Sequence, residues 1–97
     1  MLEYLKAYVS PEEYDFICAN LSPSLSLDFQ VMENNVSLIL SYLSELGIKN
    51  LSKIIVNRPE LCFRDKEVLC SQFNQINQDL LIKLIEEDLD TLICFNI

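Results

Sequence analysis

Apolar residues recur at alternating spacings of three and four along residues 29–46. The series is Phe29, Met32, Val36, Ile39, Leu43 and Leu46. Such spacing places side chains on one face of an α-helix, which has 3.6 residues per turn. Leu38, Leu40 and Tyr42 widen that face, so we expect a long helix that is contacted from two sides. A single glycine in 97 residues argues against a β domain, whose tight turns need residues that tolerate positive φ.

Capping residues mark the ends of the predicted helices. Ser10 and Glu13 form a capping box, with Pro11 between them at the first helical position. We expect Ser26 or Asp28 to cap the long helix, and the glycine that follows it to adopt a left-handed conformation. Three later helices are expected to be capped by Asn50, Asp65 and Asn77.

Two segments of the chain have the same organisation, an apolar helix followed by Pro-x-Leu. The prolines are Pro23 and Pro59, which lie 36 residues apart, and a third copy without proline lies 31 residues further on, at Asp90. Periods of this length with two helices per unit are typical of α-solenoids. We therefore expect an all-α, short solenoid-like domain over residues 1–97, with about five helices in two to three helical-pair repeats. The expected repeat units are 11–47, 48–77 and 78–97.

Residues 36–61 run from an apolar helix through Leu-Gly-Ile and a second apolar helix to Pro-x-Leu. In this order the chain resembles the mitochondrial transcription termination factor (mTERF) repeat family, over residues 11–94 and most closely over 29–69. The resemblance implies a curved stack of two α-helices and a short 3₁₀ turn per repeat. It also implies nucleic-acid or ribonucleoprotein binding along a positively charged concave face. The chain differs from that family in its few repeats, its acidity and its lack of an Arg-rich targeting segment.

Charge is unevenly distributed along the chain. Seven basic and fifteen acidic residues give a net charge of −8. A basic window over residues 49–66 holds five basic and two acidic residues, a net charge of +3, which leaves −11 for the remainder. This window is either a solvated face or a basic patch that contacts nucleic acid or a partner. Its basic residues are Lys49, Lys53, Arg58, Arg64 and Lys66.

Several classes of chemistry lack the residues they need. The chain has no histidine, so it lacks the commonest general base and zinc ligand. Glu86-Glu87-Asp88 lacks the alternating ligands and the glycine of a calcium loop, so a solvated helix face is the favoured interpretation. No glycine-rich phosphate loop is present. We expect a protein that is not an enzyme, with no catalytic residue, cofactor or metal.

Four cysteines would suit two disulfides in a secreted protein, but the first residues do not have the form of a signal peptide. All four lie in apolar stretches, which favours reduced thiols buried in the core. No apolar run reaches the roughly 18 residues that span a bilayer. An intracellular, cytoplasmic protein is expected, with no membrane association.

These observations favour a non-catalytic helical-repeat module that binds a protein partner. The alternative is a minimal mTERF-like protein that binds nucleic acid through residues 49–66, although the net charge disfavours such binding. A third interpretation is an acidic mimic of nucleic acid. The apolar terminal segments, 2–5 and 93–97, are either tucked caps or a docking surface. The sequence does not specify an oligomeric state.

Overall fold

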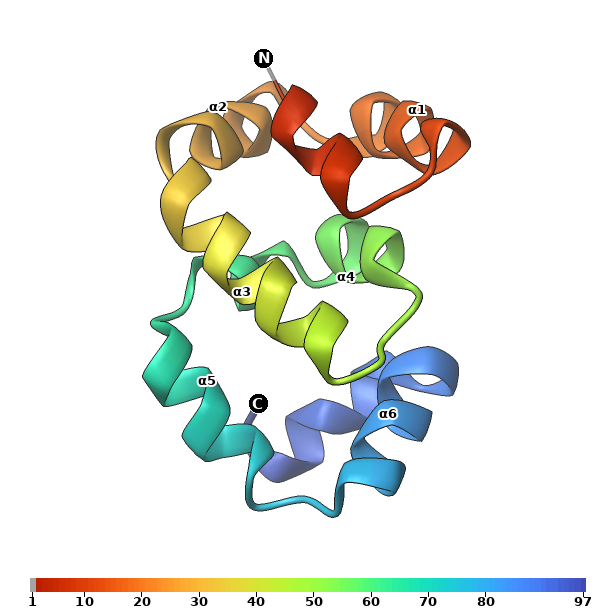
Figure 1. The fold of residues 1–97 in the computed structure, drawn as a ribbon, viewed down its shortest axis with the longest axis vertical. Helices are drawn as coiled ribbons and strands as arrows, with labels where there is room; N and C mark the ends of the chain where they lie inside the picture. The colour runs from red at the N-terminus through yellow and green to blue at the C-terminus, as the bar shows by residue number, and fades with distance from the viewer. Residues whose placement is uncertain (1) are drawn as a thin grey trace.

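The computed structural model describes residues 2–97, and every regular element in that range is helical (Figure 1). With η denoting a 3₁₀ helix, the elements in chain order are η1 (Glu3–Ala7), α1 (Pro11–Asn20), α2 (Pro23–Val31), α3 (Glu33–Glu45), α4 (Leu51–Asn57), η2 (Pro59–Phe63), α5 (Lys66–Phe73), α6 (Gln78–Glu87) and η3 (Leu89–Phe95). The predicted all-α class is confirmed. There are more elements than the five or so expected, because one predicted helix is divided and three segments are 3₁₀ helices.

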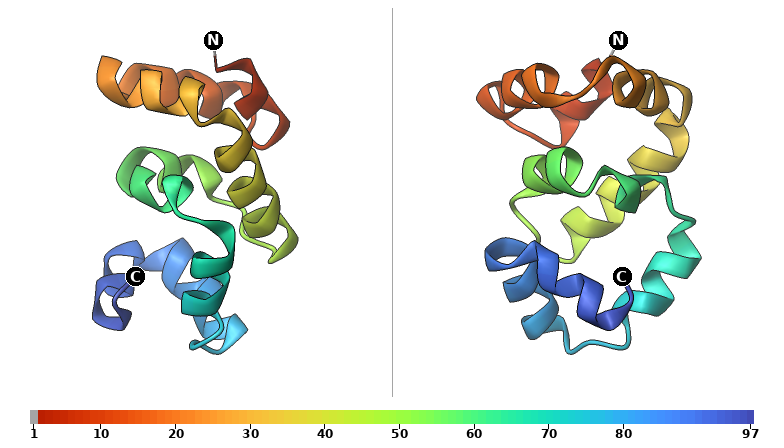
Figure 2. Two further views of the ribbon diagram at one scale, coloured as in Figure 1. Left: turned by 90° about the vertical axis from the view of Figure 1, so that its left-hand side faces the viewer. Right: turned by 180° about the vertical axis from the view of Figure 1, so that it is seen from behind.

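The helices are stacked in three tiers, which the side and rear views separate (Figure 2). The top tier holds η1, α1 and α2, the middle tier holds α4 and η2, and the bottom tier holds α6 and η3. Helices α3 and α5 run down one side and connect successive tiers. In the packing between tiers, α1 lies against α4 and α3 lies against η2. The molecule measures 35 × 24 × 22 Å along its principal axes.

The hydrophobic core extends through all three tiers. As the apolar spacing predicts, α3 buries a continuous face, and the Phe29 ring packs 4.9 Å from the Phe63 ring in a tilted arrangement. Leu38 was expected to widen the buried face but is about half exposed, because it lies on the outer face of α3. The largest fully buried side chains are Phe29, Leu5, Ile17, Ile39, Leu40, Leu43, Ile54, Ile55, Leu61, Leu69, Ile85 and Leu92.

The predicted capping box at the start of α1 is confirmed. The Glu13 amide donates to Ser10 Oγ at 3.2 Å, and the Ser10 amide donates to Glu13 Oε1 at 2.9 Å. Pro11 occupies the first helical position, where the helix needs no amide donor. These bonds satisfy two amides that a helix start leaves without a partner, and they orient the Glu13 carboxylate toward the middle tier.

The prediction of one long helix capped by Ser26 or Asp28 is wrong. The chain forms two helices, α2 and α3, which meet at Met32 with φ −99° and ψ 27°. Helix α2 starts earlier than expected because Ser22 Oγ accepts from the Leu25 amide at 3.2 Å, and Pro23 follows the cap. The Ser-Pro pair that ends the preceding helix therefore also begins the next one.

The caps of the later helices follow the predictions in two cases out of three. Asp65 Oδ1 accepts from the amides at 67 and 68, and Asn77 Oδ1 accepts from those at 79 and 80. Asn50 does occupy the N-cap position of α4, but its side chain makes no capping bond. Its Nδ2 donates instead to the Ile85 carbonyl at 2.9 Å. The prediction of a side-chain cap at Asn50 is wrong because this residue connects α4 to α6.

No disulfide joins the four cysteines, whose burial differs widely. Cys62 is fully buried and Cys70 is partly buried, whereas Cys18 and Cys94 are exposed. The expectation of burial in the core is therefore wrong for Cys18 and Cys94. Both cysteines stand on short helices in which another residue is the buried one, Ile17 in α1 and Leu92 in η3.

Candidate functional site

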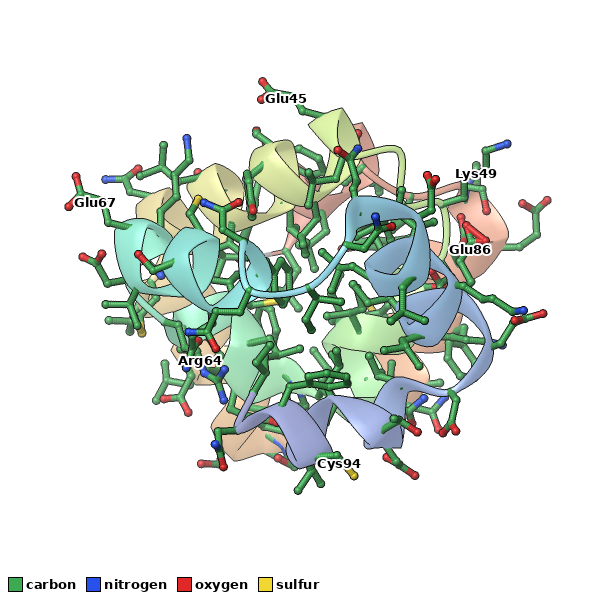
Figure 3. The ribbon with its side chains drawn as sticks, turned by 90° about the horizontal axis from the view of Figure 1, so that it is seen from below. Glu45, Lys49, Arg64, Glu67, Glu86 and Cys94 are labelled. Carbon is green, nitrogen blue, oxygen red and sulfur yellow. The ribbon has the colours of Figure 1, made fainter. Side chains whose placement is uncertain are left out.

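The structure separates the five basic residues of the window into two groups. Lys49, Lys53 and Lys66 are exposed, whereas Arg58 is only 9% exposed and Arg64 is partly buried. Viewed from below, Lys49 and Arg64 lie on opposite sides of the molecule (Figure 3). The window consequently does not form one continuous cationic surface.

Both arginines are engaged inside the protein. Arg58 Nη2 donates to the Ile97 carbonyl at 2.5 Å, and Arg64 Nη2 donates to the same oxygen at 2.9 Å. Arg58 Nε also forms an ion pair with Glu60, and Arg64 Nη1 donates to Gln72 Oε1 at 3.1 Å. Sequence reasoning could not identify these partners, because Ile97 lies 39 and 33 residues away along the chain.

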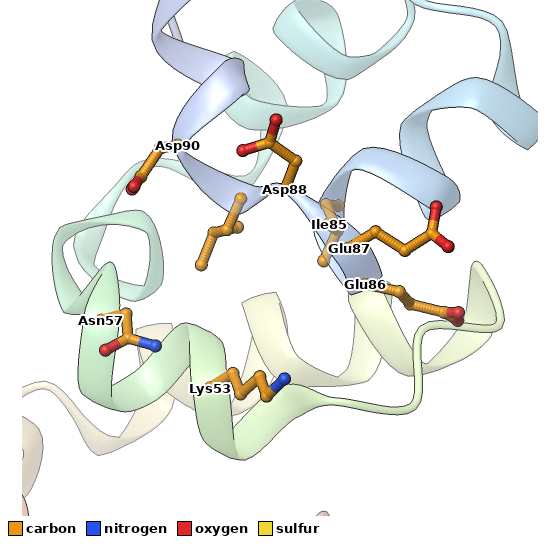
Figure 4. Close-up of a pocket in the computed structure, with 8 residues that line it drawn as sticks. Lys53, Asn57, Ile85, Glu86, Glu87, Asp88 and Asp90 are labelled. Carbon is orange, nitrogen blue, oxygen red and sulfur yellow. The ribbon is translucent and has the colours of Figure 1, made fainter.

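A cleft of about 500 Å³ separates α4 from the junction of α6 and η3 (Figure 4). Lys53 and Asn57 form its α4 wall. The opposite wall is the end of α6 and the start of η3, where the carboxylates are spread around the rim. The residues of that wall are Ile85, Glu86, Glu87, Asp88, Leu89 and Asp90.

Four carboxylates and one ammonium group line this acidic cleft, so its charge is predominantly negative. In the part of the chain that the structure describes, none of the four forms an ion pair, and Asp88 accepts a hydrogen bond from Thr91 Oγ1 at 2.6 Å. Glu86 and Glu87 also lie in the last turn of α6, where the helix dipole is negative. Their charges therefore add to the dipole, and the cleft attracts cationic groups.

Sequence reasoning considered Glu86-Glu87-Asp88 as a weak calcium site or as a solvated helix face. It missed the cleft because the opposite wall comes from α4, more than 25 residues earlier. Within residues 2–97, no three acidic or thiol side chains are placed so that they could hold a metal ion. The sequence feature that points to this cleft is the acidic run, which continues past the end of α6 to Asp90.

Tyr14 lies between two smaller cavities, of about 240 and 160 Å³. The Lys6 ammonium group lies 4.8 Å from the centre of its ring. Desolvation raises the pKa of Tyr14 to about 12, with smaller contributions from Cys18. The phenol therefore stays protonated at neutral pH.

No family model, curated protein or solved structure matches this chain. The described helices are all too short or too polar to cross a membrane. The case for a function therefore depends on the geometry of the clefts and on the distribution of charge.

Proposed function

We propose that this protein is a non-catalytic module that binds a protein partner, and that the acidic cleft receives a basic segment of that partner. The cleft carries the proposal, because its four carboxylates lack ion-pair partners and only one lysine lines the cleft with them. Lysine or arginine side chains of a partner would supply the missing charge. Attraction between an acidic and a basic surface speeds the encounter of the two proteins and favours a defined orientation between them.

The start of η3 adds an apolar contact to the charged rim. A 3₁₀ helix has three residues per turn, so Asp90 and Ile93 lie in line along one side of η3. Ile93 is 64% exposed, and Asp90 belongs to the cleft. A segment with basic and apolar residues, such as an amphipathic helix, matches this combination.

A relationship with mTERF-like helical repeats belongs to the same proposal. In two of the tiers an α-helix is followed directly by a 3₁₀ helix, α4 by η2 and α6 by η3. In the top tier, Pro23 begins an α-helix rather than a 3₁₀ helix. The repeat units 48–77 and 78–97 are therefore better supported than 11–47.

We also propose a cytoplasmic location, because exposed free thiols such as Cys18 persist in a reducing compartment.

The test is binding of a fluorescent amphipathic peptide of lysine and leucine, measured by anisotropy. We expect Glu86→Gln with Asp90→Asn to weaken binding about three- to tenfold, as loss of two surface charge contacts implies. Asp28→Asn with Glu67→Gln makes the same change of charge on α2 and α5, on the far side from α6 (Figure 1). Equal weakening by both double variants would contradict the proposal, because it would indicate a nonspecific effect of net charge.

Nucleic-acid binding through the basic window is the second candidate, and the exposure of Lys49, Lys53 and Lys66 favours it. Three phosphate contacts give a log–log salt dependence of about −2 to −3 and weak affinity. Because the two arginines are engaged and the net charge is −8, we expect no binding to duplex DNA or single-stranded RNA near 150 mM salt. Tight binding that Lys53→Glu abolishes would favour this candidate instead.

A further inference from the structure

The two walls of the acidic cleft offer different groups to a ligand. The α4 wall holds the Lys53 ammonium group and the Asn57 amide, which lie four residues apart and so share one face of the helix. An ammonium group only donates hydrogen bonds, and the amide nitrogen donates as well. The wall at the junction of α6 and η3 holds four carboxylates, which only accept them. The cleft therefore has a donor side and an acceptor side (Figure 4).

The donor side and the acceptor side do not pair with each other. In the part of the chain that the structure describes, Lys53 forms no ion pair, although four carboxylates line the same cleft. An ion pair requires a nitrogen–oxygen distance of about 4 Å or less, so a gap separates the ammonium group from the carboxylates. A ligand in this gap can contact both sides.

The size of the cleft limits what enters it. An α-helix about 10 Å across encloses roughly 400 Å³ per turn, so a cleft of about 500 Å³ is too small for a helix of several turns. A helix that lies across the mouth can instead insert individual side chains. Side chains four residues apart on a helix have their Cβ atoms about 5–6 Å apart, and their ends can diverge toward the two walls.

We propose that the partner is a helix that inserts an acidic and a basic side chain, four residues apart, into the acidic cleft. The carboxylate contacts Lys53 and Asn57, and the basic group contacts the carboxylates of α6 and η3. This inference rests on the proposed function and adds to it the charge pattern of the partner. A purely basic segment would bring a like charge against Lys53, which lowers affinity.

Two fluorescent helical peptides of the same composition test this charge pattern. Both contain lysine, leucine, alanine and one glutamate. In the first peptide the glutamate lies four residues before a lysine, on the face that bears the lysines. In the second it is moved by two residues, about 200° around the helix. The quantity measured by anisotropy is the ratio of the two dissociation constants, second peptide over first. Their net charges are equal, so this ratio reports the position of the glutamate.

We expect Lys53→Gln to lower this ratio about two- to fivefold, as loss of one surface charge pair implies. Lys53 is exposed, so the change leaves the core intact. Lys66→Gln is the matched control, because it removes the same charge from another exposed lysine, on α5 and on the far side from α6 (Figure 1). The ratio should stay unchanged in this control. Any difference between the peptides in their own helix stability is the same for all protein variants.

The outcomes separate this inference from the proposed function. A ratio that Lys53→Gln leaves unchanged, while Glu86→Gln with Asp90→Asn weakens both peptides, would overturn the inference and leave the proposed function intact. An equal fall in Lys53→Gln and Lys66→Gln would also overturn the inference, because it would indicate a long-range effect of charge. No binding of either peptide, or binding that the double variant leaves unchanged, would overturn both.

Discussion

The Ser52 hydroxyl donates to Glu13 Oε2 at 3.0 Å and thereby connects α4 in the middle tier to α1 in the top tier. The other oxygen of the same carboxylate accepts from the Ser10 amide. One side chain therefore caps a helix and bridges two tiers. Ser52 is only 7% exposed, so water is a poor alternative partner for its hydroxyl.

Replacing Ser52 with alanine should destabilise the protein by about 1–2 kcal/mol, because a hydrogen bond to a charged group is lost. Urea denaturation followed by circular dichroism measures the change. Ser44→Ala, at an exposed position of α3, is the control and should stay within about 0.5 kcal/mol of the unmodified protein. Equal stabilities for the two variants would show that the bond between α1 and α4 contributes nothing.

The same carboxylate should make stability depend on pH. The backbone hydrogen bond from Ser10 lowers the pKa of Glu13 below its ordinary value of 4.5, and the Ser52 hydroxyl adds to this effect. A lowered folded-state pKa means that the unfolded chain binds the proton more readily, so this contribution is complete above pH 4.5 and is lost as the pH falls below it. We expect the stability difference between the unmodified protein and Glu13→Gln to shrink between pH 6 and pH 3. A constant difference would contradict this assignment.

Local signals predicted much of the fold. The capping box at Ser10 and the cap at Asp65 were predictable because donor and acceptor lie within three residues of each other. The division at Met32 was not, since Pro23 fits both the residue that follows one helix and the first residue of the next. The apolar spacing continues across the break, so periodicity alone does not distinguish one helix from two.

The candidate sites depend on contacts that no local pattern encodes. Lys53 lines the same cleft as the acidic residues only because the middle and bottom tiers are stacked, and the expected repeats do not specify which side chains that stacking brings together. The basic window was treated as surface because charged residues are usually exposed. Arg58 is an exception, since Ile97 supplies an acceptor from a distant part of the chain.

Gly47 follows α3 with φ +94°, as the sequence predicts for a residue that ends a helix. Alanine there should cost about 1 kcal/mol, through backbone strain alone, because a Cβ at this position meets no atom within 4 Å. Gly47→Asn should cost less than Gly47→Ala, since asparagine tolerates positive φ better. Urea denaturation of both variants tests this order, and a neutral Gly47→Ala would contradict it.

The four thiols should react with a disulfide reagent in an order set by burial. Cys18 and Cys94 are exposed and should be labelled first, Cys70 more slowly, and Cys62 only on unfolding. Burial raises the pKa of Cys62 to about 12, so almost none of the reactive thiolate is present at pH 8. Peptide mapping by mass spectrometry after timed labelling identifies each site, and Cys18→Ser with Cys94→Ser should remove the fast phase. Labelling of Cys62 at the rate of Cys94 in the folded protein would show that the middle tier opens far more readily than this packing implies.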